Sequence, residues 1–333
     1  MNLLSITGKQ RIGLGCMNLS HAYGTPPDAA TAEALLLAAL EAGVTLFDTA
    51  ALYGFGANET LVGRVLKAHR SRIVLCSKGG MTGQPVGPGG ALQRVIDGKP
   101  DAIRRDVEDS LRRLQTDTID LYYLHRWHKA VPIEDSVGAM AEQVRAGKVR
   151  AIGLSEVSAA TLKRAQAVHP IAAVQSEYSP WSREAEIAVL QACFETGVAY
   201  VAFSPLGRGF LTALPPDPAA LDAKDIRRTM PRFSAEADAA NRLLLTEFQA
   251  IAAGLGITPA QLALAWVLSR GEHVLAIPGT TQIAHLHDNL GAAAVVLPAA
   301  AVAQVDALFA LGTVTGGRYS AASQAEVDTE QFA

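Results

Sequence analysis

Short apolar runs alternate with helical patterns through most of the 333 residues. The runs are mostly continuous rather than alternating with polar residues, which is typical of parallel strands covered on both faces. We therefore expect eight strands, at residues 12–16, 45–48, 73–78, 119–125, 149–155, 171–175, 200–204 and 274–278.

Helical patterns fill the gaps between these runs. Apolar residues recur at spacings of four, four and three from Ile103 to Leu114, with charged residues between them, which predicts an amphipathic helix. Asn58 and Thr258 are predicted N-caps, the second because Pro259 follows at the first helical position. Glycines at the ends of three helical runs predict left-handed C-caps at Gly43, Gly147 and Gly197.

Eight strands with crossover helices favour a closed (β/α)8 TIM barrel, in the α/β class, over an open doubly wound sheet. The length suits one such barrel, and since no repeat or linker interrupts the chain, we expect a single domain over residues 1–333. Two stretches rich in Gly or Pro, residues 79–100 and 207–236, are predicted long loops after strands 3 and 7. Both leave the strand ends that carry the active site of a barrel.

Composition narrows the function classes. Hydrophobic residues make up 49% and charged residues 18%, which allows a large core and argues against disorder. The net charge of -3 gives no basic surface for nucleic acid or an anionic membrane. Three separated cysteines without a CxxC pattern fit reduced thiols. Residues 1–9 lack the features of a signal peptide, and residues 34–42 are too short to span a bilayer, so a cytoplasmic enzyme is expected.

Polar side chains follow several of the apolar runs. Asp48, Lys78 and His125 each end a predicted strand, Tyr53 lies five residues after Asp48, and strand ends converge on one mouth of a barrel. A carbonyl that accepts a hydride then needs a proton, which a tyrosine can donate, although its reference pKa is about 10. A lysine ammonium lowers that pKa, an aspartate holds the lysine, and a neutral histidine can orient the carbonyl.

These residues lie in motifs that resemble those of the aldo-keto reductases. Residues 47–50, 53–54 and 58–59 are similar to the first signature of that family, and the resemblance extends from Gly13 to about Leu297. Residues 124–126 and 153–158 resemble a subgroup of bacterial and plant enzymes of the pyridoxal and aldehyde reductase type. The resemblance implies a barrel, an NADPH cofactor, and the catalytic tetrad Asp48, Tyr53, Lys78 and His125.

The resemblance also implies cofactor contacts. Ser155 and Gln175 match residues that hold the nicotinamide carboxamide, and Glu156 stands where the family usually has asparagine. Phe203 replaces a stacking tyrosine and keeps the ring face. The matching pyrophosphate loop comprises Ser204, Pro205, Leu206, Gly207, Arg208 and Gly209. The adenosine-end motif comprises Ile277, Gly279, Thr280, Thr281, Gln282, His285, Asp288 and Asn289.

That last motif departs from the family pattern. Relatives that prefer NADP usually carry lysine or arginine at one or more of the positions of Gly279, Thr281, Gln282 and His285, and this chain carries none. A 2′-phosphate would have threonine hydroxyls, backbone donors and a protonated His285. Family habit favours NADPH, and use of NADH stays open.

Other residues allow two interpretations. Tyr23, Trp127 and Trp181 follow strands and are candidates for the substrate pocket, with core or rim packing as the alternative. His128 suggests a metal pair with His125, but no third ligand is in view, so we expect a surface histidine and no metal. Gly13 and Gly15 are interpreted as a tight strand, because no GxGxxG follows.

The leading hypothesis is an enzyme that reduces aldehydes or ketones with NAD(P)H. Its alternatives are dehydrogenation of a sugar or alcohol, and a cofactor-bound regulatory subunit like the potassium-channel β subunits that resemble this family. The intact tetrad favours catalysis. The expected partner is a small carbonyl compound such as pyridoxal, methylglyoxal or an aromatic aldehyde. Monomer and homo-oligomer both remain open.

Overall fold

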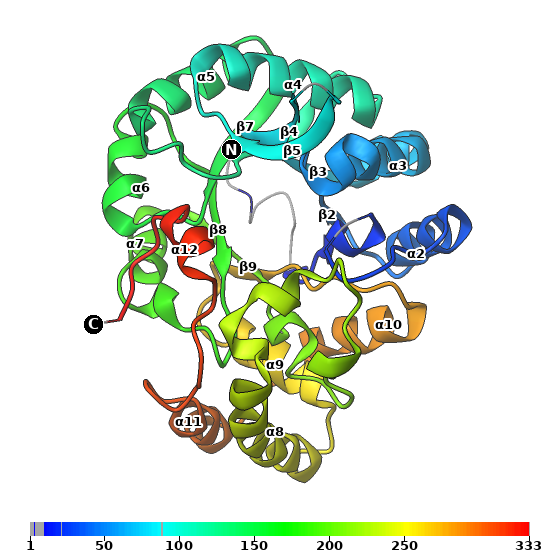
Figure 1. Cartoon of the computed structure of the whole chain (residues 1–333), viewed down its shortest axis with the longest axis vertical. Coiled ribbons are helices and arrows are strands. Elements are labelled where there is room, and N and C mark those ends of the chain that lie inside the picture. Colours follow the sequence, from blue (N-terminus) through cyan, green and yellow to red (C-terminus); the bar gives the residue numbers. More distant parts are fainter. Residues whose placement is uncertain (1–2, 4–9, 21, 88, 333) are drawn as a thin grey trace.

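A closed ring of eight parallel strands forms the centre of the molecule (Figure 1). The computed structural model describes residues 3, 10–20, 22–87 and 89–332, so the expectation that residues 1–9 are not a signal peptide lies almost wholly outside it. The backbone N–H of Gly13 donates to the carbonyl of Ala276 at 2.9 Å, and a parallel bridge joins Ile12 to Ala276. These contacts close the sheet, which confirms the predicted barrel. The strands, in sheet order, are β1 (Leu14–Gly15), β2 (Leu46–Asp48), β3 (Val74–Gly79), β6 (Ile119–Leu124), β7 (Val149–Ser155), β8 (Ala173–Glu177), β9 (Ala199–Phe203) and β10 (Val274–Ala276).

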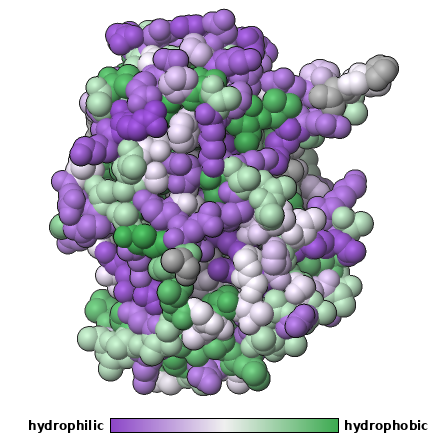
Figure 2. Space-filling model, turned by 60° about the vertical axis from the view of Figure 1, so that its left-hand side comes forward, coloured by the Kyte–Doolittle hydropathy of each residue, from purple (hydrophilic) through white to green (hydrophobic). Residues whose placement is uncertain are grey.

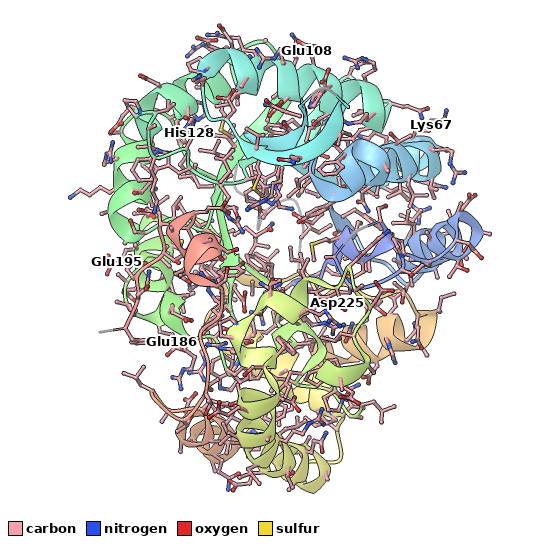
Figure 3. The ribbon with its side chains drawn as sticks, viewed as in Figure 1. Lys67, Glu108, His128, Glu186, Glu195 and Asp225 are labelled. Carbon is pink, nitrogen blue, oxygen red and sulfur yellow. The ribbon has the colours of Figure 1, made fainter. Side chains whose placement is uncertain are left out.

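Helices surround this ring (Figure 1). Figure 3 shows Lys67, Glu108 and Glu195 on the outer side of the helical layer, where all three are exposed to solvent. The helices are α2 (Ala29–Glu41), α3 (Ala57–Leu66), α4 (Pro100–Leu114), α5 (Ile133–Arg145), α6 (Ala159–Gln166), α7 (Val189–Thr196), α8 (Ala235–Gly254), α9 (Pro259–Leu268), α10 (Ile283–Gly291), α11 (Ala299–Leu308) and α12 (Ala321–Ala325).

Most of the predicted helix ends are present. Thr258 caps α9 in a capping box with Gln261, and Gly43, Gly147 and Gly197 have φ of +86°, +75° and +70°. The expectation for Asn58 is wrong, because Gly56 occupies the N-cap of α3. Asn58 instead lies buried in the first turn, where it accepts from the Thr49 hydroxyl at 2.6 Å and donates to the Cys16 carbonyl at 2.8 Å. It therefore ties β2 to the loop after β1.

Two apolar cores lie on the two sides of the sheet. The inner core fills the barrel and includes Leu46, Val74, Leu121, Tyr123 and Val201. The outer core lies between the strands and the helices, and contains the alternate residues of the same strands, including Phe47, Leu75, Tyr122 and Tyr200. Because successive strand residues point to opposite faces, this alternation fixes which later residues of each strand face the barrel axis.

The stretch after β3 differs from the prediction. Residues 79–100 are not an irregular loop: β4 (Met81–Val86) and β5 (Ala91–Ile96) pair as an antiparallel hairpin. The stretch after β9 is a long loop as expected, containing the short turns η5 (Gly207–Gly209), η6 (Pro218–Ala220), η7 (Ile226–Thr229) and η8 (Pro231–Phe233). Figure 3 labels Asp225 in this loop, beside the opening of the ring.

Exposed apolar side chains lie at one end of the molecule. Figure 2 shows apolar side chains gathered at the end of the molecule formed by α8 and α11, where Leu243 and Leu311 are exposed. Among the described residues, no single helix combines the length and apolarity needed to cross a membrane. The helices α8 and α9 pass that test of length and composition only as a pair, and they are bent by 86° at their junction.

Candidate active site

The strand alternation brings polar residues to one end of the barrel. Asp48 continues the inner face of β2 two residues after Leu46, Lys78 continues that of β3 after Val74 and Cys76, and His125 follows Tyr123 in the same phase. By the same rule Ser155, Gln175 and Phe203 face the barrel axis at the ends of β7, β8 and β9. These are carboxyl ends of parallel strands, so the side chains meet at one mouth.

At that mouth the four predicted catalytic residues lie together. The ammonium of Lys78 forms an ion pair with Asp48 Oδ1, donates to the Thr49 carbonyl at 2.9 Å, and lies 3.3 Å from the Tyr53 hydroxyl. The His125 ring lies edge-on to the Tyr53 ring, with centroids 5.8 Å apart. All of these side chains are buried. The arrangement places an acidic hydroxyl, a paired cation and an imidazole around one point.

The charges around Tyr53 act in opposite directions. Burial raises the pKa of Tyr53 most strongly, the Lys78 ammonium lowers it, and Asp48 raises it again, so that the net pKa is above the ordinary value. The expected net lowering of this pKa is therefore wrong, because burial outweighs the charge of Lys78 and Asp48 offsets part of that charge. For Lys78, burial lowers the pKa, but Asp48 and Tyr53 outweigh it and the net pKa is raised. Lys78 stays charged and Tyr53 stays protonated near neutral pH.

Gln175 belongs to the same network. Its amide Nε2 donates to Asp48 Oδ2 at 2.8 Å, while Lys78 occupies the other oxygen of that carboxylate. Asp48 is thereby held from two sides. The sequence comparison suggested only a cofactor contact for Gln175, and the structure adds a role in orienting Asp48.

A cavity of about 930 Å³ opens above these residues. It runs from Asp48, Tyr53 and His125 along the ends of β7 to β10 to the first turns of α10. Lys78 lies beneath its floor, and Gly207 lies behind the wall, against Trp181. The other predicted cofactor residues line the cavity: Ser155, Gln175, Phe203, Ser204, Pro205, Leu206, Arg208, Gly209, Ile277, Gly279, Thr280, Thr281, Gln282, His285, Asp288 and Asn289.

Glu156 has a structural role that explains its departure from the family pattern. It has a left-handed φ of +56° and is buried. Its carboxylate accepts from both terminal nitrogens of Arg318 and from the backbone N–H of Glu177. Glu156 therefore anchors the chain after α11 to the end of β7, and it is not part of the cavity wall.

Arg208 lies at the cavity wall but already has an acidic partner. Its Nη2 donates to Glu177 at 2.6 Å and to the Tyr319 hydroxyl at 3.2 Å. Burial raises the pKa of Glu177, but Arg208, Arg318 and Arg232 outweigh it, so the net pKa is lowered and Glu177 stays ionised. The guanidinium thus joins β8, the loop after β9 and the last part of the chain.

The expectation for the aromatic residues is corrected in part. Tyr23 lines the cavity. Trp181 is buried and stacks on Phe210 with ring centroids 4.1 Å apart, while the Trp127 indole donates to the Val131 carbonyl and packs on the outer core. Both tryptophans stabilise loops beside the mouth and neither lines the cavity.

Two further segments complete the cavity, and none of their residues was among the predicted site residues. The hairpin contributes Met81 and Arg94, and the last part of the chain contributes Tyr319, Ser323 and Glu326, among others. Arg94 and Glu326 join these segments through two hydrogen bonds. In a sequence such a pair shows no periodicity, because its members lie 232 residues apart.

His128 and the three cysteines make contacts that stabilise the fold. His128 Nδ1 accepts from the backbone N–H of Gly98 at 3.4 Å. No group of three or more potential metal ligands occurs among the described residues. Cys16, Cys76 and Cys193 are buried free thiols, and burial raises the pKa of each.

Comparison with known proteins agrees with this geometry. The family model described as the aldo/keto reductase family matches residues 11–310. The chain is 42% identical to the aldo-keto reductase yakc of Schizosaccharomyces pombe, whose name includes NADP(+), over 96% of this chain and 94% of that protein. It is 41% identical to the probable aldo-keto reductase 1 of Glycine max, over 93% of this chain and 88% of that protein.

Solved structures give the same result. A glycerol dehydrogenase from Gluconobacter oxydans has a TM-score of 0.81 and 28% identity, covering 90% of each chain. An aldo/keto reductase from Klebsiella pneumoniae, solved with NADP and acetate, has a TM-score of 0.68 and 30% identity, covering 96% of this chain and 95% of that one. The chain belongs to the aldo/keto reductase family.

Proposed function

We propose that this enzyme uses NADPH to reduce an aldehyde or ketone to an alcohol, with Tyr53 as the proton donor. The observation that carries the proposal is the contact of Lys78, beneath the floor of a cavity, with Asp48 and Tyr53, which line that floor. A tyrosine hydroxyl beside a lysine ammonium is sufficient to act as a general acid toward a carbonyl oxygen in this cavity. The chain acts as one domain on a small carbonyl compound.

The cavity wall suits a dinucleotide. The cavity is long, and buried polar side chains line the end that holds the tetrad. Its wall is close-packed at Gly279, where a Cβ atom would lie 2.9 Å from Asn18 Oδ1. Ser155, Gln175 and Phe203 would hold the nicotinamide end, residues 204–209 the pyrophosphate, and Thr280 to Asn289 the adenosine end. The reduced nicotinamide supplies the hydride when it is bound.

The residues of the chain then manage charge and the proton. His125 orients the substrate carbonyl toward the tetrad, and Tyr53 gives its hydroxyl proton to the carbonyl oxygen. The ammonium of Lys78 stabilises the phenolate that remains, and Asp48 keeps that ammonium charged and in place. Gln175 holds the second oxygen of Asp48. By microscopic reversibility the same groups serve oxidation of an alcohol.

The substrate end of the cavity favours a small, partly apolar aldehyde or ketone. Met17, Leu52 and Met81 give it apolar walls, and Tyr23 adds an aromatic ring with a hydroxyl. Pyridoxal, methylglyoxal and aromatic aldehydes all combine a carbonyl with a compact body of this kind. The loops that supply these walls set the substrate range.

A panel of aldehydes, ketones and sugars, assayed with NADPH and with NADH, tests the proposal. We expect consumption of NADPH with several aldehydes and slower consumption with NADH. Tight NADPH binding without turnover of any compound, in either direction, would overturn it in favour of a regulatory role.

A further inference from the structure

One arginine of the cavity wall differs from the others in its partners. Four arginines line the cavity, and three of them pair with a carboxylate: Arg94 with Glu326, Arg208 with Glu177, and Arg227 with Asp225. Arg126 makes no ion pair with any acidic residue in the described part of the chain. It is also the closest in sequence to a tetrad residue, since it follows His125.

Arg126 is held in place by hydrogen bonds rather than by charge. Its Nη1 donates to the carbonyl of His125 at 2.6 Å and to the hydroxyl oxygen of Ser155 at 3.2 Å. The guanidinium therefore joins the ends of β6 and β7. Since a serine hydroxyl has one proton, accepting from Arg126 leaves that proton free to be donated to a group in the cavity.

The charge of Arg126 is not balanced locally. The negative charge of Asp48 balances the positive charge of Lys78. With Tyr53 protonated, these three residues together carry no net charge. Arg126 adds one positive charge at the end of β7, beside the residue that would contact the nicotinamide. An oxidised nicotinamide ring is positively charged and a reduced ring is neutral, so a nearby cation disfavours the oxidised form.

We propose that Arg126 is a positioning residue that orients the Ser155 hydroxyl toward the nicotinamide carboxamide and makes the site bind reduced cofactor in preference to oxidised cofactor. This inference rests on the proposed function, because it requires the nicotinamide beside Ser155. A site of this kind releases its oxidised product readily and favours reduction of the carbonyl.

Dissociation constants for NADPH and NADP+ test the inference without any turnover. They are measured with the full chain for wild type and for Arg126→Gln, Arg126→Lys and Ser155→Ala, with melting temperatures to verify folding. For Arg126→Gln we expect the ratio of the NADP+ constant to the NADPH constant to fall about tenfold, equivalent to about 1.4 kcal/mol. Arg126→Lys keeps the charge but not the planar fork, so the ratio stays near wild type while both constants rise.

Arg94→Gln is the matched control. It removes a cavity arginine whose charge Glu326 already balances, so the ratio should stay unchanged. An unchanged ratio in Arg126→Gln, together with weaker binding in Ser155→Ala, overturns the inference and leaves the proposed function intact. If Ser155→Ala binds both cofactors like wild type, the nicotinamide does not lie beside Ser155, and the proposed arrangement of the site fails with it.

Discussion

The ammonium nitrogen of Lys78, beneath the floor of the cavity, lies 3.3 Å from the hydroxyl oxygen of Tyr53. Tyr53→Phe keeps the ring and removes the proton that this hydroxyl would donate. We expect the rate of carbonyl reduction to fall by about 10² or more, while NADPH binding persists. Steady-state rates and a fluorescence titration measure the two effects. Near wild-type turnover in this variant would identify another proton donor.

Lys78 and Asp48 should shift the titration of Tyr53 in opposite directions. The charge of Lys78 lowers the pKa of Tyr53 and that of Asp48 raises it. In alcohol oxidation Tyr53 must be deprotonated to accept a proton, so activity rises with pH through this pKa. We expect Lys78→Met to move the rising limb of kcat/KM to higher pH and Asp48→Asn to move it to lower pH. Shifts in the same direction would contradict this assignment.

Asp106 on α4 should make stability depend on pH. Its carboxylate accepts from the backbone N–H of Gly80, directly after β3, and burial raises the pKa of Asp106 to about 6. The protonated form is thus favoured in the folded state. Its contribution to stability is present below the unfolded pKa of about 4 and is lost as the pH rises through about 6.

The variant Asp106→Asn removes this titration and keeps an oxygen acceptor for Gly80. We expect it to raise the free energy of unfolding at pH 7.5 by on the order of 1 kcal/mol, allowing for partial solvent exposure. The gain should shrink toward pH 5, where wild-type Asp106 is largely protonated. Urea unfolding at both pH values measures the difference, and an equal gain at the two would argue against the raised pKa.

Gln282 should control the choice between cofactors. It is exposed at the adenosine end of the cavity wall, where no lysine or arginine follows in α10. Gln282→Arg should tighten NADPH binding about tenfold and leave NADH almost unchanged, because only NADPH carries the 2′-phosphate.

His287→Arg provides the control for this change. His287 is exposed on the same helix but does not line the cavity, so the added charge should alter neither dissociation constant by more than about twofold. A wild-type preference for NADPH above about a thousandfold would mean that groups outside this segment hold the phosphate.

The pair of Arg94 and Glu326 should affect substrate binding more than stability. The two side chains join the hairpin to the segment after α11 across the cavity mouth, and both are partly exposed. We expect Arg94→Ala and Glu326→Ala each to raise KM a few fold and to change the free energy of unfolding by less than about 1 kcal/mol. If the pair acts as a unit, the double variant resembles each single variant, whereas additive effects on KM would refute that coupling.

Local patterns were sufficient to predict the barrel, and the resemblance to the family added the tetrad. Asp48, Lys78 and His125 each extend the inner face of an apolar strand, so alternation alone places them at one mouth. Alternation did not show whether the side chains of Trp127 and Trp181 line the cavity, because both residues lie in loops beyond the strands, where that rule no longer applies. The hairpin was missed since its glycines and prolines hid the pairing of residues 81–86 with residues 91–96.

Contacts between distant parts of the chain could not be predicted from a single sequence. Glu156 was visible only as a departure from a motif, and its partner Arg318 lies 162 residues later. The same holds for Glu177 with Arg208, because nothing local distinguishes a buried ion pair from two solvated charges. The residues that anchor the last part of the chain could not be named for the same reason.

Those anchors make the last part of the chain a span fixed at both ends. Arg318 is tied to Glu156 on one side, and Asp328 accepts from Ser158 on the other. Between them, Tyr319, Ser320 and Ser323 face the cavity. Substitutions within this span can reshape the substrate end of the cavity while the barrel stays unchanged. Evolution or a designed library can therefore exchange residues 320–325 as one unit and alter substrate preference without changing the tetrad.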